Sequence, residues 1–85
     1  MNFNNKVVLV TGASRGIGAA IAKAFAAEGA VVAVNYLQNT RAAAATITEC
    51  QNLGAEASAF QADVTDSDAI TALVGEVAEA FGKID

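Results

Sequence analysis

A short apolar run that leads straight into a glycine-rich turn constrains this chain most. Residues 7–10 are Val-Val-Leu-Val, and the turn after them contains Gly12, Gly16 and Gly18. Such a run is typical of a strand buried in a parallel sheet, and helical spacing of apolar residues begins at Ile17. Glycines let a ligand approach bare amides, and the first amides of a helix favour a phosphate. The stretch therefore predicts a nucleotide-phosphate loop.

The spacing of the glycines distinguishes between kinds of phosphate loop. The usual dinucleotide fingerprint would need glycine at position 21, which is Ile21, and a P-loop would need glycine at position 17, which is Ile17. What remains is Thr-Gly-x-x-x-Gly-x-Gly, which begins at Thr11 and encloses Ser14 and Arg15. The alternative is a glycine-rich turn that binds no ligand.

Size and charge restrict the remaining possibilities. The chain has 85 residues and no proline, so we expect one small domain, residues 1–85. Its net charge of −4 is spread along the chain, and its five Lys and Arg residues form no basic cluster. Binding to nucleic acid or to an anionic membrane therefore has no electrostatic basis here.

The cysteine and histidine content and the lengths of the apolar runs restrict the possible classes of protein further. Cys50 is the one cysteine, so it forms no internal disulfide, and the chain has no histidine. We therefore expect no zinc site and no haem site ligated by histidine. Residues 1–6 are polar, the apolar run after them is too short for a signal-peptide core, and no run is long enough to span a membrane. We expect a cytoplasmic protein.

Apolar periodicity divides the chain into alternating strands and helices. Strands are expected at residues 6–11, 31–34 and 56–61, and helices at residues 16–28, 40–53 and from a capping box at Thr65 to Gly82. Thr40 is expected to cap the second helix. The residues expected to face inward from the helices are Ile17, Ile21, Ala24, Phe25, Ile47, Cys50, Leu53, Ile70, Leu73, Val74, Val77 and Phe81. This βαβαβα order predicts an α/β fold with parallel strands and right-handed crossovers.

The end of the second strand bears on the choice of cofactor. In dinucleotide-binding folds an acid there bonds the ribose 2′-hydroxyl of NAD, but this chain has Asn35 and Tyr36 and no acid until Glu49. Arg15 lies in the glycine loop, and a guanidinium suits a phosphate by charge and by geometry. We therefore expect NADP(H) in preference to NAD(H), with NAD(H) possible. The alternative is that Arg15 is a solvated loop cation and that either cofactor is accepted.

The chain resembles the short-chain dehydrogenase/reductase family at three separated places. The first is the glycine loop, which the family writes TGxxxGxG. The second is Val-Asn-Tyr at residues 34–36 with Asn39, which is similar to NADP-type members such as 3-oxoacyl-[acyl-carrier-protein] reductases and glucose dehydrogenases. The third is the pair Asp63 and Val64, and the ending at residues 81–85 also resembles the family's run into its fourth strand.

The resemblance implies a fold and a set of cofactor-binding residues. The fold is half of a doubly wound, Rossmann-type parallel sheet with strand order 3-2-1, and we expect the chain to be truncated before a fourth strand. In this family Ser14 and Arg15 would reach the phosphates, Ile17 would lend a backbone amide, and Asp63 would accept from the adenine amino group, although alone it could be an ordinary turn acid. The implied cofactor-binding residues are Gly12, Ser14, Arg15, Gly16, Ile17, Gly18, Asn35, Tyr36, Asp63 and Val64.

Catalytic residues do not carry over from the family. Its members use a serine and a Tyr-x-x-x-Lys pair, whereas the single tyrosine here, Tyr36, is followed four positions later by Thr40. The resemblance thus implies an oxidoreductase parent that transfers hydride between NADP(H) and a carbonyl or alcohol, and a chain that alone is inactive. In the full-length parent, the resemblance also suggests a homo-oligomer.

Two other hypotheses remain open. One is a free-standing nucleotide-binding or assembly module without catalysis. In either case the first strand would present a bare apolar edge, to be covered by a missing C-terminal half or by another chain. The other is a flavodoxin-like or related doubly wound domain, which the third glycine and the Asp-Val pair disfavour.

Overall fold

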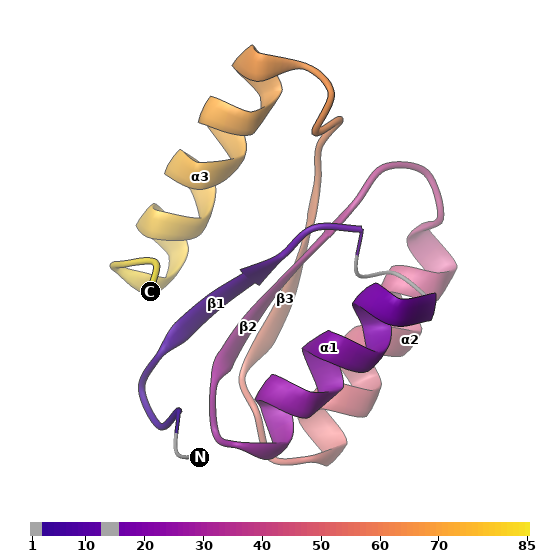
Figure 1. Ribbon diagram of the computed structural model, residues 1–85, viewed down its shortest axis with the longest axis vertical. Coiled ribbons are helices and arrows are strands. Elements are labelled where there is room, and N and C mark those ends of the chain that lie inside the picture. The colour runs from indigo at the N-terminus through magenta and orange to yellow at the C-terminus, as the bar shows by residue number, and fades with distance from the viewer. Residues whose placement is uncertain (1–2, 13–15) are drawn as a thin grey trace.

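The computed structural model describes residues 3–12 and 16–85. They form three strands and three helices in strict alternation (Figure 1). The elements are β1 (Val7–Val10), α1 (Gly16–Ala27), β2 (Val31–Tyr36), α2 (Thr40–Asn52), β3 (Ala57–Gln61) and α3 (Ser67–Phe81). The strands are parallel and lie in the order β1-β2-β3, which confirms the predicted half of a doubly wound sheet.

The sheet is covered on both faces: α1 and α2 lie on one side and α3 on the other (Figure 1). Because side chains alternate along a strand, β2 sends Val32 and Val34 toward α1 and α2 and sends Ala33 toward α3. Leu73 and Val77 of α3 complete the second layer of the core. This two-sided burial explains why the strands consist of nearly continuous apolar residues.

The face that α1 presents to the sheet differs from the predicted one. Ile17 is 82% exposed and Ile21 is 43% exposed, while the buried residues of α1 are Ala19, Ala22 and Ala26. Small side chains let α1 pack closely on the sheet, which leaves the larger ones at its margin. The predictions for Ala24, Leu53, Ile70 and Val74 were also wrong, because all four are exposed.

The helix caps also differ from the prediction by one residue. Asn39, and not Thr40, caps α2, because its side chain accepts a hydrogen bond from the Ala42 amide at 2.9 Å. Asp66, and not Thr65, caps α3 and accepts from the Asp68 amide at 2.9 Å. Asparagine, aspartate and threonine are all preferred N-cap residues, so the neighbouring residues decide which of two adjacent candidates caps the helix.

Candidate functional site

The carboxyl ends of the three parallel strands meet at one edge of the sheet, and the predicted site residues lie there. β1 leads into Gly12, β2 ends at Tyr36, and β3 leads through Ala62 into Asp63. The N-terminus of α1, at Gly16, lies at the same edge, as the ribbon shows (Figure 1). In open parallel sheets this edge is where ligands bind.

Two glycines give the turn after β1 its shape. Gly12 has φ 62° and Gly16 has φ 67°, a conformation that residues with a Cβ rarely adopt. Apart from its chain neighbours, no atom of the described residues lies within 4 Å of a Cβ placed on either glycine, so the described part of the chain leaves the space beside the turn open. The backbone, and not crowding, therefore requires glycine here, and the open space allows a ligand to approach the amides.

The described residues cover only part of the predicted loop. Ser14 and Arg15 lie outside them, so their predicted contacts with phosphate stay predictions. Ile17 is in the first turn of α1 with its side chain largely in solvent, and Gly18 follows it in the same turn. At the N-terminus of a helix the first amides lack intrahelical partners, so this turn can accept an anion.

Asn35 is buried beneath this edge, with 2% of its surface exposed. The second strand extends beyond residue 34, where the sequence predicted its end, because Asn35 and Tyr36 pair with Phe60 and Gln61 of β3. The side chain of Asn35 accepts a hydrogen bond from the Gly12 amide at 3.3 Å. A polar residue directly after the apolar residues 31–34 is a signal that could have indicated a structural role for Asn35, but the sequence gives no indication of its partners.

The segment after β2 is held by β3. Gln61 donates a hydrogen bond from Nε2 to the carbonyl of Leu37 at 2.9 Å. This contact fixes the backbone just beyond Tyr36, where the cofactor ribose is expected. Sequence reasoning did not single out Gln61, since an exposed strand-end glutamine gives no such signal.

Asp63 lies just after β3 in a side-chain turn. Its Oδ1 accepts from the Thr65 amide at 2.9 Å and from the Thr65 hydroxyl at 2.6 Å. These two bonds, the hydroxyl first, lower the pKa of the Asp63 carboxyl from its ordinary value, so the group is held as a carboxylate. Thr65, predicted as a helix cap, therefore orients Asp63, and the Asp-x-Thr spacing was the signal for this turn. Val64 is 39% exposed beside it.

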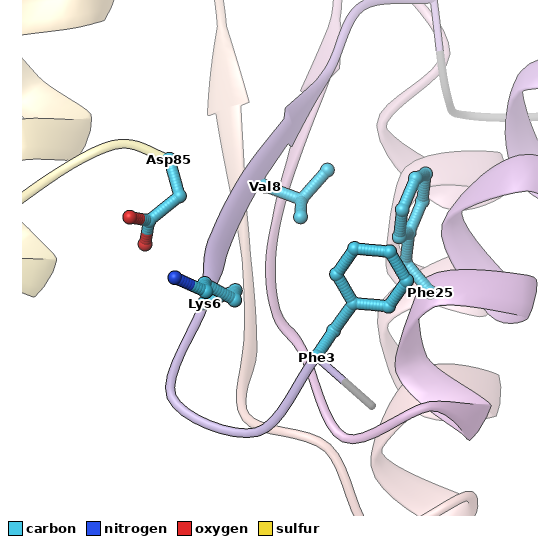
Figure 2. A pocket seen from close by; sticks show the side chains of 5 residues that line it. All are labelled: Phe3, Lys6, Val8, Phe25 and Asp85. Carbon is cyan, nitrogen blue, oxygen red and sulfur yellow. The ribbon is translucent and has the colours of Figure 1, made fainter. Parts of the chain in front are cut away.

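A separate hollow of about 420 Å³ lies near the opposite end of β1. Figure 2 shows its lining: the rings of Phe3 and Phe25, the side chain of Val8, and the charged groups of Lys6 and Asp85. The two rings meet edge to face with their centres 5.0 Å apart. No residue of the glycine turn and no residue at the ends of β2 and β3 is among those that line this hollow.

Acidic residues and Cys50 are the possible metal ligands in residues 3–12 and 16–85. That part of the chain contains no group of three or more His, Cys, Asp or Glu residues placed to hold a metal ion. Of its helices, none has both the length and the apolar character needed to cross a bilayer.

Comparison with known proteins connects this geometry to a family. The model of the short chain dehydrogenase family matches residues 6–85. Versicolorin reductase stcU of Emericella nidulans is 49% identical over 83 residues, which are 98% of this chain and 31% of that protein. The 3-oxoacyl-[acyl-carrier-protein] reductase FabG of Staphylococcus aureus is 46% identical over 80 residues, which are 94% of this chain and 32% of that protein.

Solved structures agree with this result. A short chain dehydrogenase from Burkholderia cenocepacia in complex with NADP superposes with a TM-score of 0.94 at 48% identity, and the match covers 100% of this chain and 35% of that one. The chain thus spans about a third of the length of these relatives. The family match extends from the start of β1 through all three helices, and the predicted resemblance is confirmed: this chain belongs to the short-chain dehydrogenase family.

Proposed function

We propose that residues 1–85 form one dinucleotide-binding half-domain that binds the adenosine-diphosphate half of NADP(H). The observation that carries this proposal is the pair Gly12 and Gly16, both at positive φ with open space beside them, at the N-terminus of α1. Backbone amides at such a turn can approach a diphosphate closely, and the helix dipole favours its negative charge. The residues present therefore fit the phosphates of this cofactor.

The residues that would hold the phosphates are those of the glycine turn. Gly12 and Gly16 shape it, and Gly18 lies in the first turn of α1. Ile17 would offer a backbone amide, and Ser14 and Arg15 would add side-chain donors. The Ile17 side chain is largely exposed, which suits this role because only the backbone amide of Ile17 would contact the phosphates.

The adenine would be read at the end of β3. Both bonds from Thr65 fall on Oδ1 of Asp63, which leaves Oδ2 to accept from the adenine amino group. The backbone amide of Val64 would make the second contact. Asp63 would accept as a carboxylate, and the charged form is the better acceptor.

The preference for NADP(H) rests on the region after β2. Asn35 and Tyr36 place no carboxylate there, so nothing anionic repels a 2′-phosphate, and Arg15 would complement its charge. The relative from Burkholderia cenocepacia was crystallised in complex with NADP, which supports the same choice. NAD(H) remains a possible second cofactor.

The activity that we propose for the protein as a whole is that of a reductase or dehydrogenase. NADP(H), when bound, supplies or accepts the hydride, and this chain's own residues bind and orient its adenosine-diphosphate half. We assign no catalytic residue to this chain, and we predict that it has no activity by itself. The outer edge of β1 is where a further strand, from the rest of a longer protein or from another chain, would add. Homo-oligomer formation and a cytoplasmic location stay predictions.

The test compares two glycines with the same backbone constraint. Gly16 and Gly54 both have positive φ, at 67° and 90°, and a Cβ would meet nothing within 4 Å at either. Gly16→Ala and Gly54→Ala should therefore cost similar stability, about 1 kcal/mol each. Only Gly16→Ala should weaken NADPH binding, by about tenfold, in a fluorescence titration of the protein that carries this chain.

Gly54 follows α2 at the far end of the sheet, so it serves as the control for backbone strain alone. Equal losses of NADPH affinity in the two variants would contradict the assignment of the glycine turn. Absence of saturable NADPH binding by the unaltered protein would overturn the proposed function as a whole.

A further inference from the structure

The side chain of Asn35 joins three segments that are far apart in the sequence. Its Oδ1 accepts from the Gly12 amide at 3.3 Å, and its Nδ2 donates to the carbonyls of Phe60 at 3.3 Å and Ala62 at 3.2 Å. Gly12 offers only a donor and the two carbonyls offer only acceptors, so the orientation of the amide is determined by its partners. Asn35 therefore links the turn after β1 to the end of β3 through β2.

This link uses both donor hydrogens of the amide group and one of the two acceptor sites on its oxygen. Asn35 has 2% of its surface exposed, so the absence of these partners would leave buried polar groups unpaired, which is unfavourable. Both Nδ2 hydrogens and Oδ1 are engaged. A buried, satisfied network of this kind gives its members one defined geometry, because any displacement leaves a polar group unpaired.

The two ends of the link are the two ends of the proposed ligand site. Gly12 opens the phosphate turn, and Ala62 directly precedes Asp63, the proposed adenine acceptor. The Ala62 amide also donates to the carbonyl of Tyr36 at 3.0 Å, so Ala62 is held to β2 by its carbonyl and by its amide. The Asn35 side chain thus adds to the strand pairing in defining the separation between the phosphate turn and Asp63.

We propose that Asn35 is a positioning residue for the cofactor: it holds the glycine turn and Asp63 at the separation that the adenosine-diphosphate half requires. This proposal rests on the proposed function. Asn35 acts here through Gly12 and Ala62, and it need not touch the cofactor itself. A ligand that spans both ends depends on that separation, whereas a fragment that occupies one end does not.

The experiment compares ligands that span the site with ligands that do not. Asn35→Leu and Asn35→Ala both remove all three hydrogen bonds, and neither places an anion at the strand end where the 2′-phosphate is expected. NADPH affinity should fall about tenfold in both variants, measured by titration under conditions where circular dichroism shows them folded. Binding of adenosine alone and of pyrophosphate alone, followed by NMR, should change less than about twofold.

Thr46→Val is the matched control. Thr46 is also buried, at 3% exposed, and its hydroxyl donates to the Ala42 carbonyl within α2, away from the strand ends. This variant should lose stability without any change in the ratio of NADPH affinity to fragment affinity.

Each outcome decides the proposal. Variants of Asn35 that lose NADPH and fragment affinity in equal proportion, or that behave like Thr46→Val, overturn it while the proposed function stands. If neither Asn35 variant folds, Asn35 is a folding residue and the positioning role is overturned. Failure of the unaltered protein to bind NADPH would instead remove the proposed function.

Discussion

Asp85 and Val7 form a pair of hydrogen bonds across 78 positions of sequence. The Val7 amide donates to Oδ2 of Asp85 at 2.8 Å, and the Asp85 amide donates to the Val7 carbonyl at 2.8 Å. Lys83 lies 3.1 Å from the same carboxylate oxygen. Residues 82–85 are not a strand, but this pair occupies the outer edge of β1 at its first residue, on the side away from β2.

The Asp85 pair predicts a loss of stability in acid. The Val7 amide first, and then Lys83, lower the pKa of Asp85 below its unfolded value of 3.8. A group with a depressed folded pKa stabilises the fold above its unfolded pKa and loses that effect as the pH falls through the folded value. Urea unfolding should show Asp85→Asn to be less stable than the unaltered chain at pH 7, with a difference that shrinks below pH 3.8.

When Lys83→Met is present in both proteins, the pH-dependent stability difference caused by Asp85→Asn should become smaller but should persist. The Val7 amide is the larger cause of the lowered pKa of Asp85, and it is still present. A stability difference between Asp85→Asn and the unaltered chain that stays constant from pH 7 into acid would contradict the prediction.

Gly75 is predicted to be replaceable with a gain in stability. It lies inside α3, is exposed, and a Cβ there would meet nothing within 4 Å. Gly75→Ala should therefore raise the free energy of unfolding by about 1 kcal/mol, through helix propensity alone. Gly82→Ala is the contrast in the same helix: Gly82 has φ 82° at the C-cap, so alanine there should cost about 1 kcal/mol. Thermal unfolding of both variants tests the prediction, and shifts of the same sign would refute it.

Thr65 is predicted to control the ionisation of Asp63. Thr65→Val removes the hydroxyl that donates at 2.6 Å but keeps the backbone amide bond at 2.9 Å. The pKa of Asp63 should rise, because the hydroxyl is the largest cause of its depression, and an NMR titration of the side-chain carboxyl would measure the shift. Thr71→Val removes a hydroxyl that donates to the Ser67 carbonyl within α3, and it should leave the Asp63 titration as it was.

Arg15 is predicted to determine the preference for NADP(H). Arg15→Glu replaces a cation that would pair with the 2′-phosphate by an anion that repels it, so NADPH affinity should fall by about tenfold or more. NADH lacks that phosphate, and its affinity should change much less. Parallel titrations of the protein that carries this chain with the two cofactors make the comparison, and equal losses would show that Arg15 does not select between them.

Much of the fold was predictable because it rests on local patterns. Val7–Val10 reads as a buried strand, Gly29 and Gly82 follow two of the helices at positive φ, and the alternation of six elements follows from apolar spacing. Each of these signals depends on residues within a few positions of one another. The predicted strand order and the family were confirmed for the same reason, since the glycine pattern and the Asp-Val pair are short motifs.

Choices between nearly equivalent residues were less predictable. Asn39 and Thr40 are both good caps, and Ile17 and Ala19 are both apolar, so their local sequence does not decide which is used or buried. The distance between α1 and the sheet decides whether Ile17 or Ala19 is buried. Buried alanines allow close packing of α1 on the sheet, and Ile17 is left 82% exposed.

The sequence by itself determined the order of the elements, the position of the glycine turn and the family, because local backbone preference and side-chain periodicity are written in neighbouring residues. Only the tertiary structure decided that Asn35 bonds Gly12, Phe60 and Ala62, and that Asp85 meets Val7. These contacts join residues 23 to 78 positions apart. Such partners come together only when the strands have paired in register and their buried polar groups must find donors and acceptors across the sheet.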